Sequence, residues 1–150
     1  MALQCSASLL RIGIAVCCAV LGSSALARLG DTEKQIFTLY GKPIKTPTRD
    51  EEGVITKIYR VKNYFILVEL EEGKSISEAY GHMDGTPLYN KEISAFLDVN
   101  SDGKTWGEKL GSKKRWDRSD KGAEAVYLNL GGQSMLWIRS KVEDDKLSQL

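Results

Sequence analysis

Two short stretches hold the side chains whose types and spacing could support chemistry. In the first, Asp98, Asn100 and Asp102 alternate along the chain and Gly103 follows, as in the first half of a calcium-binding loop. Position 12 of such a loop needs a bidentate glutamate, but Lys109 stands there. The same polar residues and glycine also end helices and form turns. We therefore predict no metal, and keep a weak calcium site at Asp98, Asn100 and Asp102 as the alternative.

The second stretch, residues 104–121, combines an excess of cations with two tryptophans. Cations can attract a polyanion and aromatic rings can stack on it, and outside the cytoplasm anionic glycans or lipid head groups would be such partners. The alternative is that both tryptophans are core anchors and the cations solvate a loop, because tryptophan is highly buried on average. The candidate binding residues are Trp106, Lys113, Lys114, Arg115, Trp116 and Arg118.

Catalytic chemistry has little support in the remaining residues. His82 is the only histidine, which excludes a multi-histidine metal site, and a serine hydrolase would need it as base without any G-x-S-x-G turn. The following Asp84-Gly85 favours a turn beside His82 instead. Neither a dinucleotide-binding nor a phosphate-binding glycine motif is present. We predict no catalytic residues, no cofactor and no enzymatic activity.

Residues 1–27 have the layout of a secretory signal peptide. Arg11 precedes an apolar stretch, and Ala25-Leu26-Ala27 forms an A-x-A site with cleavage expected after Ala27. The apolar stretch is shorter than the roughly 20 residues of a bilayer-spanning helix. A retained anchor and lipid attachment at Cys17 are the alternatives, although bulky Val16 fits a lipidation site poorly.

Removal of this leader would leave one domain, residues 28–150, of a size that can bury a core of its own. All three cysteines lie in the leader, so the mature domain would have no thiol chemistry and no disulfides. Loss of Arg11 would also balance acidic and basic side chains, so no net charge attracts nucleic acid. We expect a periplasmic or secreted protein that does not span a membrane after processing.

Hydrophobic periodicity predicts an α+β fold. An antiparallel sheet of four to five strands should carry two short helices on one face, with the segments around 42–53 and 104–122 as loops and no internal repeat. Helix 32–40 should open with a Thr32–Gln35 capping box and end at Gly41, and Asn90 should cap the second helix. The final hairpin should place Val126, Leu128, Leu136 and Ile138 on a shared face. The predicted helices are 32–40 and 91–99, and the predicted strands are 54–61, 64–70, 75–82, 123–130 and 134–142.

The segment from about residue 29 to 75 resembles the unit of beta-lactamase-inhibitor-protein-like domains and small outer-membrane-assembly lipoproteins. The matching residues are Gly30, Thr32, Gly41, Pro43, Tyr59, Val68, Gly73 and Lys74, and the pattern departs from the family at Glu69-Leu70. The later segment looks like that of small uncharacterised secreted bacterial proteins. These resemblances imply protein binding or an envelope scaffold, not catalysis.

The leading hypothesis is therefore a non-enzymatic exported domain that binds another envelope protein, through its sheet face or its tryptophan-containing loop. A binding module for anionic glycan or lipid head groups, centred on Lys113 to Arg118, is the alternative.

Overall fold

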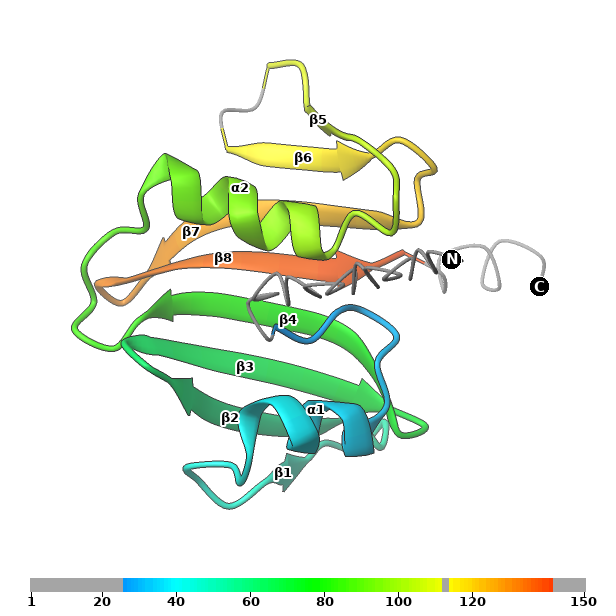
Figure 1. The fold of residues 1–150 in the computed structure, drawn as a ribbon, viewed down its shortest axis with the longest axis vertical. Coiled ribbons are helices and arrows are strands. Elements are labelled where there is room, and N and C mark those ends of the chain that lie inside the picture. Colours follow the sequence, from blue (N-terminus) through cyan, green and yellow to red (C-terminus); the bar gives the residue numbers. More distant parts are fainter. Residues whose placement is uncertain (1–25, 112–113, 142–150) are drawn as a thin grey trace, which may run out of the picture.

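The computed structural model describes residues 26–111 and 114–141 of the 150-residue chain. They form an α+β domain in which one eight-stranded antiparallel sheet carries two helices on the same face (Figure 1). The predicted fold class and the position of both helices are thus confirmed. The predicted number of strands, four to five, is wrong.

The two helices are α1, Glu33–Tyr40, and α2, Asn90–Val99. The strands are β1, Thr48–Arg49; β2, Ile55–Val61; β3, Tyr64–Glu71; β4, Lys74–His82; β5, Trp106–Glu108; β6, Arg115–Arg118; β7, Ala123–Leu130; and β8, Gln133–Ser140. Their order across the sheet is β1-β2-β3-β4-β8-β7-β6-β5.

The three strands that the sequence did not reveal are short and lie toward the edges of the sheet. β1 has 2 residues, β5 has 3 and β6 has 4, all within segments expected to be loops. Such lengths are too short for periodicity to show, and polar or charged side chains are common on edge strands because they discourage pairing with other chains. Hydrogen bonding to a neighbouring strand defines them instead: β1 pairs with β2, β6 pairs with β7, and β5 pairs with β6.

The fold also contains a repeat that the sequence does not show. A helix followed by four strands, α1 and β1–β4, precedes a second helix with four strands, α2 and β5–β8, and the strand order of one half mirrors that of the other. The halves meet where β4 pairs with β8, from Ser77 opposite Arg139 to Tyr80 opposite Leu136. The expectation of no internal repeat is wrong for the architecture.

The two helices begin with different caps, and only α1 has a reciprocal side-chain cap. In α1, the Thr32 hydroxyl accepts from the Gln35 amide, the Gln35 side chain accepts from the Thr32 amide, and Gly41 ends the helix at φ 75°, as predicted. In α2, the cap is Tyr89 and not Asn90, because Glu92 Oε2 accepts the Tyr89 amide at 2.7 Å. Asn90 is instead the first residue of the helix.

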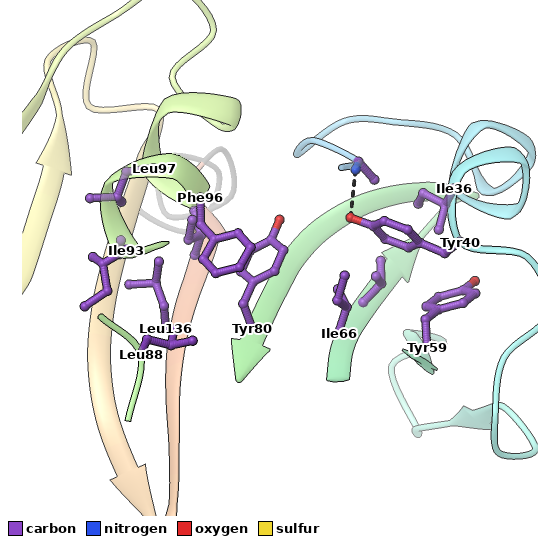
Figure 2. Close-up of a cluster of buried hydrophobic side chains, with 14 of the residues drawn as sticks. Ile36, Tyr40, Tyr59, Ile66, Tyr80, Leu88, Ile93, Phe96, Leu97 and Leu136 are labelled. Atoms are coloured by element: carbon purple, nitrogen blue, oxygen red, sulfur yellow. Dashed lines mark hydrogen bonds between the residues drawn. The ribbon is translucent and has the colours of Figure 1, made fainter. Parts of the chain in front are cut away.

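The core lies between the helices and the sheet, in two parts that meet at Tyr80 (Figure 2). The Tyr80 ring stacks on Phe96 of α2 with centroids 4.2 Å apart, while Tyr40 of α1 packs against Tyr59 at 5.4 Å. Tyr80 is fully buried, and burial of each such ring stabilises the fold by roughly 2 kcal/mol. One strand residue therefore links the parts of the core beneath both helices.

The final hairpin does not place its four apolar residues on one face. The two-residue Gly131-Gly132 turn sets Val126 opposite Trp137, whereas Leu136 and Ile138 lie opposite Tyr127 and Ala125. Since side chains alternate across a strand, Leu136 and Ile138 are buried under the helices, and Val126 and Leu128 lie on the other face. The prediction of a shared face is wrong, because the Gly131-Gly132 turn sets the register of β7 with β8 and this register divides the four residues between the two faces.

Gly81 in β4 is required for a close approach between side chain and backbone. A Cβ at this position would lie 2.4 Å from the Phe65 ring and 2.7 Å from the Ser134 carbonyl oxygen. The ring could swing away, but the backbone oxygen of β8 cannot move without disturbing the central pairing. The absence of a side chain at residue 81 thus maintains the junction of the two halves.

We predict that Gly81→Ala lowers the free energy of unfolding by about 1–3 kcal/mol, because the added methyl overpacks this site. Gly107→Ala in β5 is the matched control, since the nearest atom to its added Cβ is 4.0 Å away. Urea unfolding of the three proteins measures the difference. Equal stability of the two variants would contradict the close-contact explanation.

Candidate binding face of the sheet

The sheet face opposite the helices carries a row of apolar side chains. Ile58, Leu67, Ala79, Trp137 and Val126 lie directly opposite one another on β2, β3, β4, β8 and β7. Cross-strand partners share a face, so the row continues through the junction of the halves. No described helix covers this face (Figure 1), where Ala79 is buried and the other four side chains of the row are partly buried.

Trp137 lies in this row on β8, at the junction with β4, and is fixed in place. Its indole N–H donates to the Ser77 hydroxyl at 2.5 Å, and its partner Ala79 is only 3% exposed. Trp137 itself is partly buried. A ring whose orientation is already set loses little conformational freedom when it binds a partner.

A hollow of about 220 Å³ opens beside Trp137. Val126 and Leu128 add further apolar surface, and charged residues from β6, β7 and β8 surround it. An apolar floor with a polar rim is the arrangement found in protein interfaces. The lining residues are Lys109, Arg115, Trp116, Asp117, Glu124, Ala125, Val126, Leu128, Trp137 and Arg139.

Some charges on the rim neutralise one another. Lys141 Nζ lies 2.7 Å from Asp117 Oδ1 and 3.2 Å from Glu124 Oε2, and Glu124 also pairs with Arg139. The hydrogen bond from Lys141 lowers the pKa of Asp117. Burial opposes ionisation of Glu124, but hydrogen bonds from Arg139 and Lys141 lower its pKa overall. Among the described residues, the exposed Arg115 side chain has no hydrogen bond or ion pair.

The residues of the predicted tryptophan-containing site are divided between the two faces. Trp116 is opposite the core residue Ala125 and Arg118 is opposite Trp106, which places all three predicted residues on the helix side. Arg115 is opposite Val126 and so belongs to the uncovered face. Lys114 lies in the turn before β6, with Nζ 4.6 Å from the Tyr127 ring centroid. Lys113 lies outside the described residues.

Both tryptophans of that stretch pack against the core. The Trp106 indole N–H donates to the Leu97 carbonyl at 2.7 Å, which anchors β5 to the end of α2. Arg118 donates to the Asn100 carbonyl at 3.1 Å and to Asp120 at 2.9 Å. These contacts match the alternative in which Trp106 and Trp116 are structural. The sequence analysis gave Trp137 no role, because the face on which it lies depends on the register of β8 with β7.

Of the candidate calcium ligands, Asn100 is engaged in hydrogen bonds within the fold. Asn100 is 2% exposed, and its side-chain oxygen accepts the Leu29 amide at 2.9 Å while its amide donates to Tyr80 and Phe96. Asp98 and Asp102 are exposed. Within residues 26–111 and 114–141 no group of three His, Cys, Asp or Glu side chains is placed to hold a metal.

His82 joins β4 to the start of α2. Its Nε2 lies 3.1 Å from Glu92 Oε1 and its Nδ1 lies 2.8 Å from the Thr86 hydroxyl, which itself donates to Asp84. Glu92 also accepts from the Tyr64 hydroxyl, and burial together with this bond raises the pKa of Tyr64 to about 12. His82 is 5% exposed, and its contact with Glu92 connects β4 to the start of α2.

A second titratable group, Glu78, is buried beneath the junction of the halves. It is fully buried and accepts hydrogen bonds from Ser75, at 3.0 Å, and from Tyr80. Burial raises the pKa of Glu78 to about 7, although both hydrogen bonds act in the opposite direction. Burial also raises the pKa of Tyr80 well above its usual value. The Glu78–Tyr80 hydrogen bond therefore lies inside the core.

Comparisons with known proteins assign no family. No protein-family model matches the chain, and no curated protein sequence does. Among solved structures, a cysteine-rich secretory protein from Staphylococcus aureus is distantly similar, with a TM-score of 0.46 and 12% identity. The match covers 76% of this chain and 45% of that one, so this chain spans less than half its length.

The predicted leader, residues 1–27, lies outside the described residues except for Leu26 and Ala27. In the part of the chain that the structure describes, neither helix has the length and apolar character needed to cross a bilayer.

We predict that the folded protein loses stability as pH rises from about 4.5 to about 7. In this range folded Glu78 keeps a proton that the unfolded chain has released, so raising the pH favours unfolding, by an amount on the order of a few kcal/mol. Glu78→Gln cannot ionise and should show a smaller loss between pH 5 and pH 8 in urea unfolding. An equal loss in both proteins would mean that Glu78 is ionised in the folded state.

Proposed function

We propose that this chain is a non-enzymatic exported domain that binds an envelope protein through the uncovered face of its sheet. The signal-peptide layout of residues 1–27 supports export. The apolar row on the sheet, partly buried and covered by no described helix, supports binding, because a continuous apolar row at a surface is typical of protein interfaces. The buried positions of His82 and Glu78 leave both groups with structural roles.

Trp137 is the observation that carries this proposal. It is a large aromatic side chain at the centre of an uncovered face, held by Ser77 and next to a hollow that an apolar partner side chain can fill. Tryptophan is enriched among residues that dominate binding energy, and these cluster near the centre of interfaces. Arg115 and Lys109 at the rim favour a partner with acidic groups around its apolar anchor.

An anionic glycan or lipid head group bound through the basic segment is the second candidate. Arg115 is exposed with no described bonding partner, which favours it. Trp106 and Trp116 pack against the core, which reduces the aromatic surface available for stacking. The two candidates therefore differ in which residues they need: Trp137 for a protein, and Lys114 with Arg115 for a polyanion.

We predict that Trp137→Ala weakens binding to the native envelope partner by about 2 kcal/mol, roughly 30-fold in Kd, because the central anchor is lost. Phe37→Ala is the matched control, since Phe37 is aromatic and 52% exposed on α1, on the opposite side of the sheet. The partner is first isolated by affinity capture from the envelope. Titration calorimetry with that purified partner then compares the two variants.

Circular dichroism and urea unfolding check that the Trp137→Ala variant is folded. Val126→Ser, a smaller change on the same row, is a second variant for the same binding measurement. Equal affinity of the Trp137 and Phe37 variants would contradict the proposal. A protein interface led by tryptophan should change little with salt, whereas affinity for a polyanion falls steeply as ionic strength rises. A steep dependence abolished by Lys114→Gln with Arg115→Gln would favour the glycan or lipid instead.

A further inference from the structure

Leu26 and Ala27 are part of the folded domain, although the sequence alone assigns them to the leader. Ala27 is 0% exposed, and Leu26 is partly buried against the same core. The Ala27 amide donates to the Tyr40 hydroxyl at 2.7 Å (Figure 2). The last two residues of the predicted signal peptide thus contribute packing and a buried hydrogen bond.

The bond to Tyr40 matters because this ring is central to the packing of α1. Tyr40 is 8% exposed, its ring contacts Tyr59, and burial raises the pKa of its hydroxyl far above the usual value. A buried hydroxyl that loses a hydrogen-bond partner destabilises the fold. Removing Ala27 would take away this partner and leave the space of a fully buried methyl group unfilled.

The residues that follow continue the same attachment. The Arg28 amide donates to Asp31 at 2.8 Å, the Leu29 amide to the Asn100 side chain at 2.9 Å, and the Gly30 amide to the Ser75 carbonyl at 2.7 Å. The chain from Ala27 onward therefore enters the domain as one bonded segment that contacts α1, the end of α2 and β4. Ala27 and Arg28 both donate hydrogen bonds to the domain, so the bonded segment does not begin at Arg28.

Three bonds in this region satisfy the requirement of a signal peptidase for small residues at the first and third positions before cleavage. The residue pairs are Ala25 and Ala27 for cleavage after Ala27, Ser23 and Ala25 for cleavage after Ala25, and Gly22 and Ser24 for cleavage after Ser24. Cleavage after Ala27 removes the buried Ala27 and its bond to Tyr40, whereas the other two cleavages keep both. Of these two, cleavage after Ala25 has alanine at the first position and is closer to the A-x-A pattern. Building on the proposed export, we propose that a signal peptidase hydrolyses the Ala25–Leu26 bond, so that the mature chain begins at Leu26.

In this step water adds across the peptide bond, leaving a carboxylate on Ala25 and an α-ammonium on Leu26. The new charge then lies one residue before the buried Ala27 amide, which remains a neutral peptide N–H able to donate to Tyr40. Cleavage between Leu26 and Ala27 would instead place an ammonium in this buried site, at a large desolvation cost.

The test is N-terminal sequencing and intact-mass measurement of the full-length protein after export. We expect the sequence Leu-Ala-Arg and a mass greater by one leucine and one alanine than that of a chain starting at Arg28. A start at Arg28 or at Ala25 would overturn the proposed site while leaving export intact. An exported chain that keeps its leader would overturn both the cleavage and the signal-peptide interpretation, and neither result concerns binding by the sheet face.

Two substitutions distinguish the candidate bonds in the same assay. Ser23→Leu places a bulky residue three positions before the proposed bond and leaves Ala25 and Ala27 unchanged, so the product starting at Leu26 should disappear. Ala27→Leu leaves Ser23 and Ala25 in place, so processing before Leu26 should continue whether or not the product folds well. The opposite pattern, with Ala27→Leu blocking processing and Ser23→Leu having no effect, would overturn the proposal.

Discussion

The pairing of β4 with β8 is the interaction on which the rest of the structure depends. It joins two units of one helix and four strands into a continuous sheet, along a short register from Ser77 to Tyr80. Its inward side chains build the core, where Tyr80 stacks on Phe96. Its outward side chains place Ala79 beside Trp137 and so complete the apolar row. Core and uncovered face are thus two sides of one junction.

The same junction explains why polar groups are buried there. Glu78 and Tyr80 share a hydrogen bond, and the Asn100 side chain ties the pair to the end of α2 and to the Leu29 amide. Buried polar groups need partners, and the partners available at this point come from β4, α2 and the entering chain. The fold therefore joins its two halves by hydrogen bonds between specific residues as well as by packing.

The sequence predicted the elements with strong periodicity and missed those formed mainly by neighbouring structure. Both helices and the five longer strands were found because their apolar residues repeat at helical or strand spacing. β6 was missed because its few residues pair with the longer β7 without a pattern of their own, and β5 was missed because it in turn pairs with β6. The face of Trp137 could not be deduced, since it depends on the register set by the Gly131-Gly132 turn.

The central claim is that a protein partner contacts the uncovered sheet face. It is tested most directly by placing a photoreactive amino acid at Val126, on that face, and at Phe37, on the helix side, and irradiating intact cells. The account predicts one discrete protein adduct from position 126 that is lost on adding Trp137→Ala, and none from position 37. An adduct from position 37 alone, or one from position 126 that persists without Trp137, would contradict it.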